Sequence, residues 1–207
     1  MGLRLLFLSW WTPKYIIYRE LARVDALTTE ALEALLSKYS TNNKEEKTKK
    51  EATSKGSIEQ RRDSMALKHA NLVNSLVEVL GKEEAVMLGR EAMFKIGEKL
   101  GRETAQKLGV GKSLKDLTRA AKILYRILGI EFEVELQNST NAVLIVNRCA
   151  LASNYSELTC QVLSATDEGT IKGLNQNMKM SFTQKMTSGL PECKAKIKFE
   201  VDGGTNN

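Results

Sequence analysis

Apolar and polar residues alternate most clearly in the C-terminal half of the chain. In residues 130–136, Ile, Phe, Val and Leu alternate with three glutamates, which places the carboxylates on one face of a β-strand and the apolar side chains on the other. Residues 137–141 are polar and suited to a turn, and residues 142–146 form an unbroken, mostly β-branched run. Such a run is typical of a strand that is covered on both faces. We therefore expect residues 130–149 to form a hairpin whose second strand is central in its sheet.

A second hairpin is predicted for residues 180–201. Apolar residues alternate with lysines and one glutamate from Cys193 to Val201, and residues 180–187 alternate in the same way. Between them, Gly and Pro in residues 188–192 end a strand. We expect the two hairpins to join in one four-stranded antiparallel sheet. The pattern does not give the strand order, so it leaves open whether the glutamate row and the lysine row are neighbours.

Helical spacing of apolar residues covers most of the first 128 residues. It predicts helices over residues 14–39, 57–80, 82–108 and 114–128, the first of which could divide at Thr28. We also expect a helix over residues 151–163 and a turn at residues 167–169. Helices first and strands later predict an α+β fold, with N-terminal helices packed on the sheet.

The glycines of residues 82–108 predict close packing of that helix. Gly89, Gly97 and Gly101 would let another backbone approach that helix closely. Charged residues between them favour ordinary packing inside a soluble domain over a membrane dimer.

Composition divides the chain into three parts. Residues 40–56 are polar and predict a flexible charged linker between an N-terminal helical segment, residues 1–39, and an α+β domain, residues 57–207. The net charge of +6 raises the question of nucleic acid, but residues 44–62 alone hold seven basic and four acidic residues. Few aromatic residues there could stack on bases, so a solvated linker is favoured over a nucleic-acid partner.

No apolar run reaches the roughly 20 residues that a membrane-spanning helix needs. Residues 5–11 are apolar but short, and Pro13 and Lys14 follow. We expect a cytoplasmic protein without a membrane partner. The apolar N-terminal segment would pack on the domain or dock on another subunit, which gives a homo-oligomer such as a dimer.

Three cysteines lie in the last third of the chain, at positions 149, 160 and 193. An odd number does not indicate a disulfide framework. Cys149 ends the predicted central strand and Cys193 begins the last one, so both could meet near Cys160. Three thiolates with a carboxylate or histidine could bind zinc, or one thiol could be a nucleophile. Without paired-cysteine spacing, buried apolar thiols are the favoured interpretation, and no metal or cofactor is predicted.

Motifs of known chemistry are missing from the sequence, which has no phosphate loop, dinucleotide fingerprint or nucleophile elbow. His69 is the only histidine, and on a helix it is interpreted first as a polar packing residue. Met178, Met180, Phe182 and Met186 form a soft apolar group. They could line a pocket for a flat or apolar ligand, although core packing is the favoured interpretation of each one.

The order of several short segments resembles the L-2-amino-thiazoline-4-carboxylic acid hydrolase family over about residues 57–201. Residues 68–76 and 80–85, with Gly97 and Gly101, resemble the helical half of that family. In the other half, the matching pieces are Arg148-Cys149-Ala150-Leu151-Ala152 for its Cys-Pro-Leu segment, Cys160 and Asp167 for a later Cys and Asp, Gly173-Leu174-Asn175 for an Asn-Pro step, and residues 189–199 for the closing strand. Ala150 in place of proline and Leu190-Pro191 in place of Gly-Asp put the substrate, but not the fold, in question.

The chain also resembles the 4-vinyl reductase domain, an α+β module that binds small molecules. Some members of that group hold zinc through a Glu-x-x-Cys-x7-Cys arrangement. Counted back from Cys193, the two earlier positions here are Lys185 and Phe182, so that zinc site is not carried over.

The hydrolase resemblance implies that water opens a cyclic carbon–nitrogen bond in a small amino-acid-like thiazoline. Cys149 or Asp167 would activate water or attack carbon, and His69 or Cys160 would donate a proton. Arg148 would bind the substrate carboxylate, and further substrate contacts are expected from Asn175, Met180 and Phe182. The alternatives are a non-catalytic sensor or carrier for an apolar ligand, and a nucleic-acid or partner-docking protein that uses the basic linker.

Overall fold

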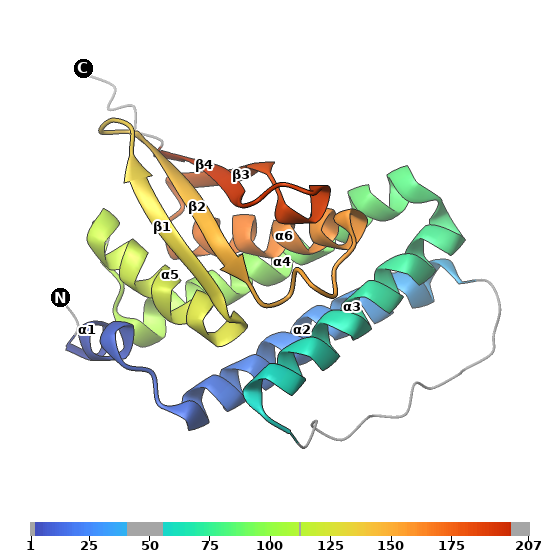
Figure 1. The fold of residues 1–207 in the computed structure, drawn as a ribbon, viewed down its shortest axis with the longest axis horizontal. Coiled ribbons are helices and arrows are strands. Elements are labelled where there is room, and N and C mark those ends of the chain that lie inside the picture. The colour runs from blue at the N-terminus through green and yellow to red at the C-terminus, as the bar shows by residue number, and fades with distance from the viewer. Residues whose placement is uncertain (1–2, 41–55, 112, 200–207) are drawn as a thin grey trace.

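The computed structural model describes residues 3–40, 56–111 and 113–199 (Figure 1). In these residues the chain forms an α+β fold with the elements α1 (Leu3–Trp10), α2 (Lys14–Tyr39), α3 (Ile58–Leu80), α4 (Lys82–Leu108), α5 (Leu114–Leu128), β1 (Ile130–Leu136), β2 (Asn141–Cys149), α6 (Glu157–Leu174), β3 (Met178–Gln184), a 3-10 turn η1 (Met186–Ser188) and β4 (Cys193–Phe199).

The four strands form one antiparallel sheet in the order β1-β2-β4-β3, as the two predicted hairpins require. β2 is central, as expected, and joins the hairpins by pairing with β4. Its helix-facing residues are buried, but Val143 and Ile145 on the other face are only half-buried, so β2 is not fully covered on both faces. The register explains why, since Ile145 lies between Glu133 of β1 and Lys194 of β4. The glutamate and lysine rows therefore flank the β-branched residues of β2 on the outer face.

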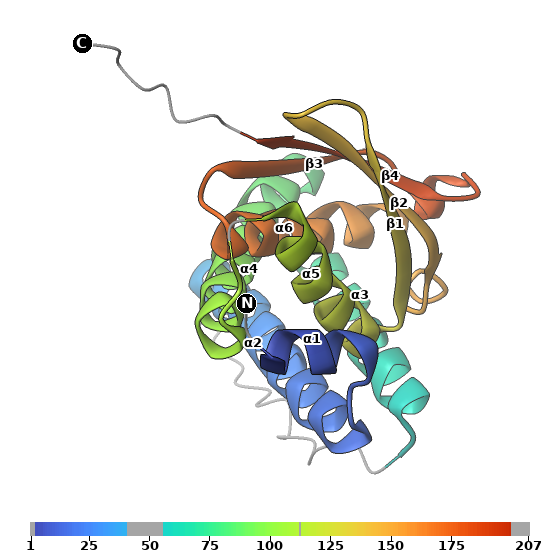
Figure 2. The same cartoon turned by 90° about the vertical axis from the view of Figure 1, so that its left-hand side faces the viewer.

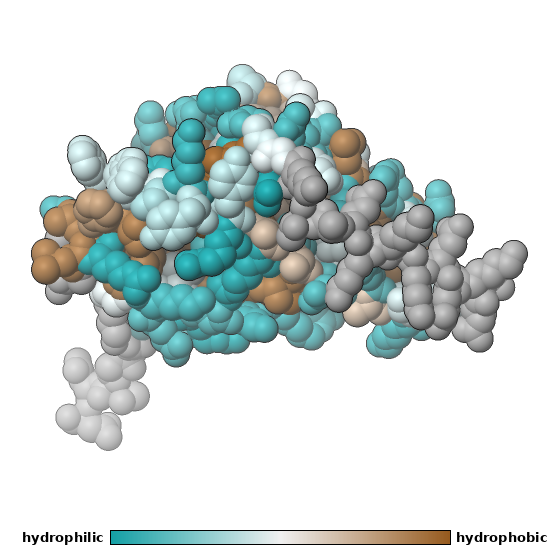
Figure 3. Space-filling view, turned by 90° about the horizontal axis from the view of Figure 1, so that it is seen from below, coloured by the Kyte–Doolittle hydropathy of each residue, from teal (hydrophilic) through white to brown (hydrophobic). Residues whose placement is uncertain are grey.

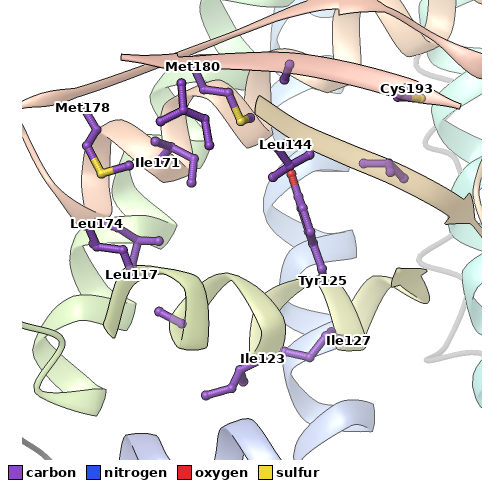
Figure 4. Close-up of a cluster of buried hydrophobic side chains, with 14 of the residues drawn as sticks. Leu117, Ile123, Tyr125, Ile127, Leu144, Ile171, Leu174, Met178, Met180 and Cys193 are labelled. Atoms are coloured by element: carbon purple, nitrogen blue, oxygen red, sulfur yellow. The ribbon is translucent and has the colours of Figure 1, made fainter. Parts of the chain in front are cut away.

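The helices all lie on one side of the sheet, as Figure 2 shows. α5 packs against β1 and α6 against β3, while α4 packs behind α6 and α2 packs beside α3. The main apolar core lies between α5, α6 and the sheet (Figure 4). Met178, Met180 and Leu144 are buried there. Tyr125 points from α5 towards the sheet.

Local signals account for several helix ends. Ser57 and Gln60 form a reciprocal capping box at the start of α3. Ser113 and Ser156 cap α5 and α6 by accepting a hydrogen bond from a backbone N–H three residues later. Gly129 ends α5 in the left-handed conformation, with φ of 72°.

Four expectations about element boundaries were wrong. The helix expected over residues 151–163 begins only at Glu157, as α6. α2 runs unbroken through Thr28, whose hydroxyl donates back to the carbonyl of Val24. α6 runs through residues 167–169, where a turn was predicted. β3 ends at Gln184 after a register shift, so residues 185–187 do not continue the strand.

The N-terminal segment packs on its own chain. Leu5 and Leu8 of α1 are buried against the core cluster, and α1 contacts α5. Most of the predicted linker, residues 41–55, lies outside the described residues. No described helix is both long and apolar enough to cross a membrane.

Candidate functional site

A cavity of about 90 Å³ lies where α2, α3, α5 and α6 meet the sheet. It brings together five residues that the sequence singled out as site candidates: His69, Cys149, Cys160, Asp167 and Phe182. Cys193 lines it too, so all three cysteines share one cavity. The remaining lining is mostly apolar and comes from Val24, Thr28, Met65, Tyr125, Leu128, Ile130, Val146, Leu151, Tyr155, Leu163, Ser164, Thr166 and Lys185.

Among the ionisable groups of the cavity, Asp167 has the pKa that best suits acid–base catalysis near neutral pH. Burial raises the pKa of its carboxyl group to about 7, although a hydrogen bond with Tyr125 favours the ionised form. Glu168 beside it adds a smaller upward shift to the same pKa. A carboxyl group with a pKa near neutrality can both accept and return a proton at physiological pH.

His69 is neutral and held by two hydrogen bonds. Burial lowers the pKa of its imidazole to about 4. Its Nε2 lies 2.8 Å from the hydroxyl of Thr28, and its Nδ1 lies 2.7 Å from the hydroxyl of Tyr155. The Thr28 hydroxyl donates to the carbonyl of Val24, so it must accept the proton of Nε2. The Tyr155 hydroxyl therefore donates to Nδ1, which leaves its own oxygen as an acceptor.

The three cysteines are thiols rather than thiolates at neutral pH. Burial raises the pKa of Cys149 to about 11, even though the backbone N–H groups of Leu151 and Ala152 favour its thiolate. Burial also raises the pKa of Cys160 and Cys193. Within residues 3–40, 56–111 and 113–199, no group of three or more His, Cys, Asp or Glu side chains is arranged to hold a metal ion.

Two polar groups on the cavity lining were missed by the sequence reasoning. The first is Lys185, which was placed on the solvent side of a continuing strand but reaches the cavity because β3 ends one residue earlier. The second is Thr166, whose buried Oγ1 has no hydrogen-bond partner among the described residues. A buried hydroxyl without a partner is costly, so it indicates a place for a polar ligand atom.

The two tyrosines of the site were missed as well. Tyr125 and Tyr155 each place a hydroxyl among the ionisable groups, where burial raises the pKa of both well above its usual value. In the sequence Tyr125 is one of the apolar positions of a strongly amphipathic helix, and Tyr155 lies in a connection. Neither carries a local signal of function.

Three predicted site residues lie elsewhere. Arg148 is on the surface, with its side chain 73% exposed and paired with Glu131 at 3.0 Å. It lines a separate open cleft of about 500 Å³ in which basic and acidic side chains are mixed. Asn175 ends α6 and accepts a hydrogen bond from the backbone N–H of Asn177. Met180 is buried in the core under the sheet.

Comparisons with known proteins agree with this architecture. Residues 60–197 match the model of a family described as L-2-amino-thiazoline-4-carboxylic acid hydrolase. The search of curated proteins gives no match.

Two solved structures share the fold at low sequence identity. One is a trafficking protein particle complex subunit 3 from Naegleria fowleri covalently bound to palmitic acid, with a TM-score of 0.54, 14% identity, and coverage of 69% of this chain and 96% of that one. The other is the phenol-responsive sensory domain of the transcription activator PoxR with phenol, with a TM-score of 0.50, 16% identity, and coverage of 65% and 74%. At these identities the likeness concerns the fold.

Proposed function

Because the chain belongs to the L-2-amino-thiazoline-4-carboxylic acid hydrolase family, we propose that it hydrolyses a small cyclic amino-acid-like substrate in the cavity beneath the sheet. The observation that carries this proposal is the carboxyl group of Asp167, whose pKa is raised by burial to about 7 and which lines this cavity. The unpartnered hydroxyl of Thr166 supports it, because a polar substrate would satisfy that group.

In the proposed reaction, water opens a carbon–nitrogen bond of the substrate ring. The Asp167 carboxylate takes one proton from the water as its oxygen bonds to the ring carbon. As the carbon–nitrogen bond breaks, the leaving nitrogen takes that proton from Asp167, which returns to its ionised form. The sum is the addition of one water molecule. The hydrogen bond from Tyr125 holds the carboxylate in place through both steps.

His69 is assigned as a positioning residue. Its single N–H is bonded to Thr28, and its pKa of about 4 keeps it neutral, so it has no proton to give the substrate at neutral pH. By accepting from Tyr155, it turns that hydroxyl oxygen into an acceptor for a substrate N–H group. This geometry supports Tyr155 as a substrate-binding residue.

Cys149 is assigned as a lining thiol. A thiol with a pKa of about 11 has almost no thiolate at neutral pH, which argues against direct attack by its sulfur on the substrate. Cys160 is half-buried, and burial raises its pKa too, so its sulfur is also protonated and a poor nucleophile at neutral pH. Its expected role as a proton donor stays a prediction.

The proposal is tested by turnover of L-2-amino-thiazoline-4-carboxylic acid, with the ring-opened product followed by chromatography. Asp167→Asn keeps the shape of the side chain but cannot accept the proton, so kcat should fall by about 10²- to 10⁴-fold. Cys149→Ser should keep kcat within a few fold. Loss of turnover in Cys149→Ser together with full activity in Asp167→Asn would overturn the assignment of Asp167.

Lys185 is proposed to bind the substrate carboxylate, the role that the family resemblance implied for Arg148. It is half-buried on the cavity lining, and its charge favours the thiolates of Cys160 and Cys193. Lys185→Ala should raise KM more than it lowers kcat. Arg148→Ala is the matched control, because it removes a cation that lies outside the cavity, and its KM should stay unchanged.

The second candidate function is a non-catalytic binding module of the 4-vinyl reductase type, a sensor or carrier for a small apolar ligand. The mostly apolar lining favours it, and the two similar structures contain phenol and palmitic acid. A cavity of about 90 Å³ is smaller than the roughly 150 Å³ engineered cavity that holds benzene. A ring such as phenol would therefore need the lining side chains to move apart, and a long acyl chain would need still more room. Saturable calorimetric binding of phenol without any turnover of the thiazoline would favour this candidate.

A further inference from the structure

The helix α1 is apolar on opposite sides, although only one side contacts the rest of the chain. Leu5 and Leu8 face the protein and are 1% and 7% exposed. On the opposite side, Leu3, Phe7 and Trp10 are 85%, 52% and 83% exposed. A helix that is apolar all round is normally buried on all sides, so the outward side of α1 indicates a missing cover.

These side chains form one surface, which we call the α1 patch. It consists of the exposed residues Leu3, Leu6, Phe7, Trp10, Trp11 and Tyr15. Figure 3 shows hydrophobic surface gathered at the end of the molecule where α1 lies. Exposed apolar patches that hold several large side chains mark interaction sites more often than single exposed residues do.

The patch rests on a fixed support. The guanidinium of Arg126 on α5 donates to the carbonyls of Leu8 and Ser9 at 3.2 and 2.9 Å, and to the hydroxyl of Thr12 at 3.0 Å. These bonds satisfy the last carbonyls of α1 and fix its direction along α5. The outward side of α1 is therefore held towards solvent rather than free to turn inwards.

Basic side chains border the patch. Arg4 and Lys14 are basic and no acidic residue precedes position 20, while Arg19 pairs with Glu20. On α5, which lies beside α1 in Figure 2, basic residues at positions 115, 119, 122 and 126 fall on one side of the helix. Lys115 and Lys122 are exposed, while Arg119 pairs with Asp116.

We propose that the α1 patch lies on the surface of an anionic lipid bilayer. α1 would lie flat among the headgroups with its apolar side chains inserted, and Lys115 and Lys122 would face the lipid phosphates. Tryptophan and tyrosine favour this depth because their rings are both apolar and able to hydrogen-bond. The proposal departs from the expectation of no membrane partner, which was based on the lack of an apolar run long enough to span a bilayer. A helix that lies flat on the surface needs no such run.

Charge favours lipid over a second copy of the chain. A two-fold contact through the patch would bring Arg4 and Lys14 of both copies to the same rim, where like charges repel. An anionic surface instead attracts them. The proposal concerns a surface apart from the cavity and does not depend on the hydrolase function.

Tryptophan fluorescence tests the proposal on the full chain, because Trp10 and Trp11 are its only tryptophans and both belong to the patch. Vesicles of phosphatidylcholine with phosphatidylserine should shift the emission to shorter wavelength, and brominated acyl chains should quench it. Vesicles of phosphatidylcholine alone should give a much smaller change, and high salt should reverse the binding. Unchanged emission with anionic vesicles would overturn the proposal.

Sedimentation with the anionic vesicles identifies the surface. The double change Phe7→Ser and Trp10→Ser should lower the vesicle partition coefficient roughly tenfold or more, because two exposed apolar side chains are removed. Lys115→Glu with Lys122→Glu should lower it by a similar factor. The matched controls are Met87→Ser, another exposed apolar residue, and Lys99→Glu, both on α4 and both expected to bind as the parent does.

Two results would exclude a lipid surface as the cover of the patch. One is equal vesicle binding by the parent and the Phe7→Ser, Trp10→Ser variant. The other is a parent that ignores vesicles but is a dimer by light scattering and becomes a monomer on Trp10→Ser, which would assign the patch to a second copy of the chain.

Discussion

The two sides of α6 differ sharply in how they are packed. On the side that faces α4, part of the contact is backbone against backbone, since a Cβ atom on Gly97 would lie 2.0 Å from the carbonyl oxygen of Thr166. A Cβ atom on Gly169 would likewise lie 2.1 Å from the carbonyl oxygen of Phe94. The side that faces the sheet instead lines a cavity and carries the carboxyl group of Asp167 and the thiol of Cys160. One face of α6 thus packs against the backbone of α4, and the opposite face lines the cavity.

The difference shows how the fold holds a buried carboxyl group in place. A buried ionisable group weakens the fold around it, because desolvation disfavours its charged form. Close contact with α4 fixes α6 on its other side, where at Gly97 and Gly169 backbone packs directly on backbone. The glycine contact therefore supports the position of Asp167 without touching the cavity.

The largest expected effect comes from breaking the glycine contact. Gly97→Ala puts a methyl group against a backbone carbonyl, which cannot move without shifting α6, so the free energy of unfolding should fall by about 3 to 5 kcal/mol. Gly89→Ala is the matched control on the same helix. There the new Cβ would meet the side chain of Val162 at 2.8 Å, and that side chain can give way, so the loss should stay near 1 kcal/mol.

Urea unfolding of both variants measures the difference. Equal losses for Gly97→Ala and Gly89→Ala would contradict the view that the backbone contact, rather than general crowding along α4, holds α6.

The close approach at the α4 glycines was predicted from the sequence, but the α6 segment that makes this contact was not. The spacing of the glycines of α4 predicted a close approach of another backbone, and their contact with the backbone of α6 confirms that expectation. Their partner was hidden because residues 167–169, Asp-Glu-Gly, are favoured in turns when taken alone. In the protein the helix that starts at the Ser156 cap continues through them, since packing against α4 outweighs local preference.

The fold class was more predictable than the site for a physical reason. Alternation in residues 130–136 and 193–199 follows directly from burial of one strand face, so it specifies strands locally. The cavity instead depends on where separate elements meet. Tyr125, Tyr155 and Lys185 come from a helix, a connection and a strand end, and no spacing in the chain links them.

The second effect lies wholly on the cavity side and concerns pH. Asp167 has a pKa of about 7 in the folded protein against 3.8 for an ordinary carboxyl group, so its contribution to stability falls as pH rises between these values. His69 has a pKa of about 4 against 6.5, so its contribution is lost as pH falls through that range. Between pH 4 and 6.5 the two slopes, each about 1.4 kcal/mol per pH unit, have opposite signs and cancel.

Single variants should uncover each slope. Relative to the parent, Asp167→Asn should gain about 3 kcal/mol in stability between pH 4 and 6.5, because only the His69 term remains. His69→Gln should lose a similar amount over the same range. Urea unfolding at several pH values measures the free energy of unfolding of each variant. The comparison uses the slope of that free energy against pH, so a loss of stability that is equal at all pH values does not affect it. Parallel slopes in the two variants would contradict the assignment of these pKa shifts.

The smallest expected effect tests whether the two sides of α6 are electrostatically linked. Glu168 is adjacent to Asp167 and pairs with Arg90 of α4 at 2.6 Å, so it lies between the packed side and the cavity. Its charge raises the pKa of Asp167, and Glu168→Gln should lower that pKa by less than burial raises it, because burial is the larger cause. The acid limb of the kcat profile should move to lower pH, and a carbon-13 NMR titration of the Asp167 carboxyl group should show the same shift.

Lys95→Ala is the control, because it breaks the exposed Lys95–Glu91 pair of α4 far from the cavity and should leave the titration where it was. A shift to higher pH in Glu168→Gln would mean that loss of the Arg90 pair, rather than removal of a neighbouring negative charge, dominates at Asp167.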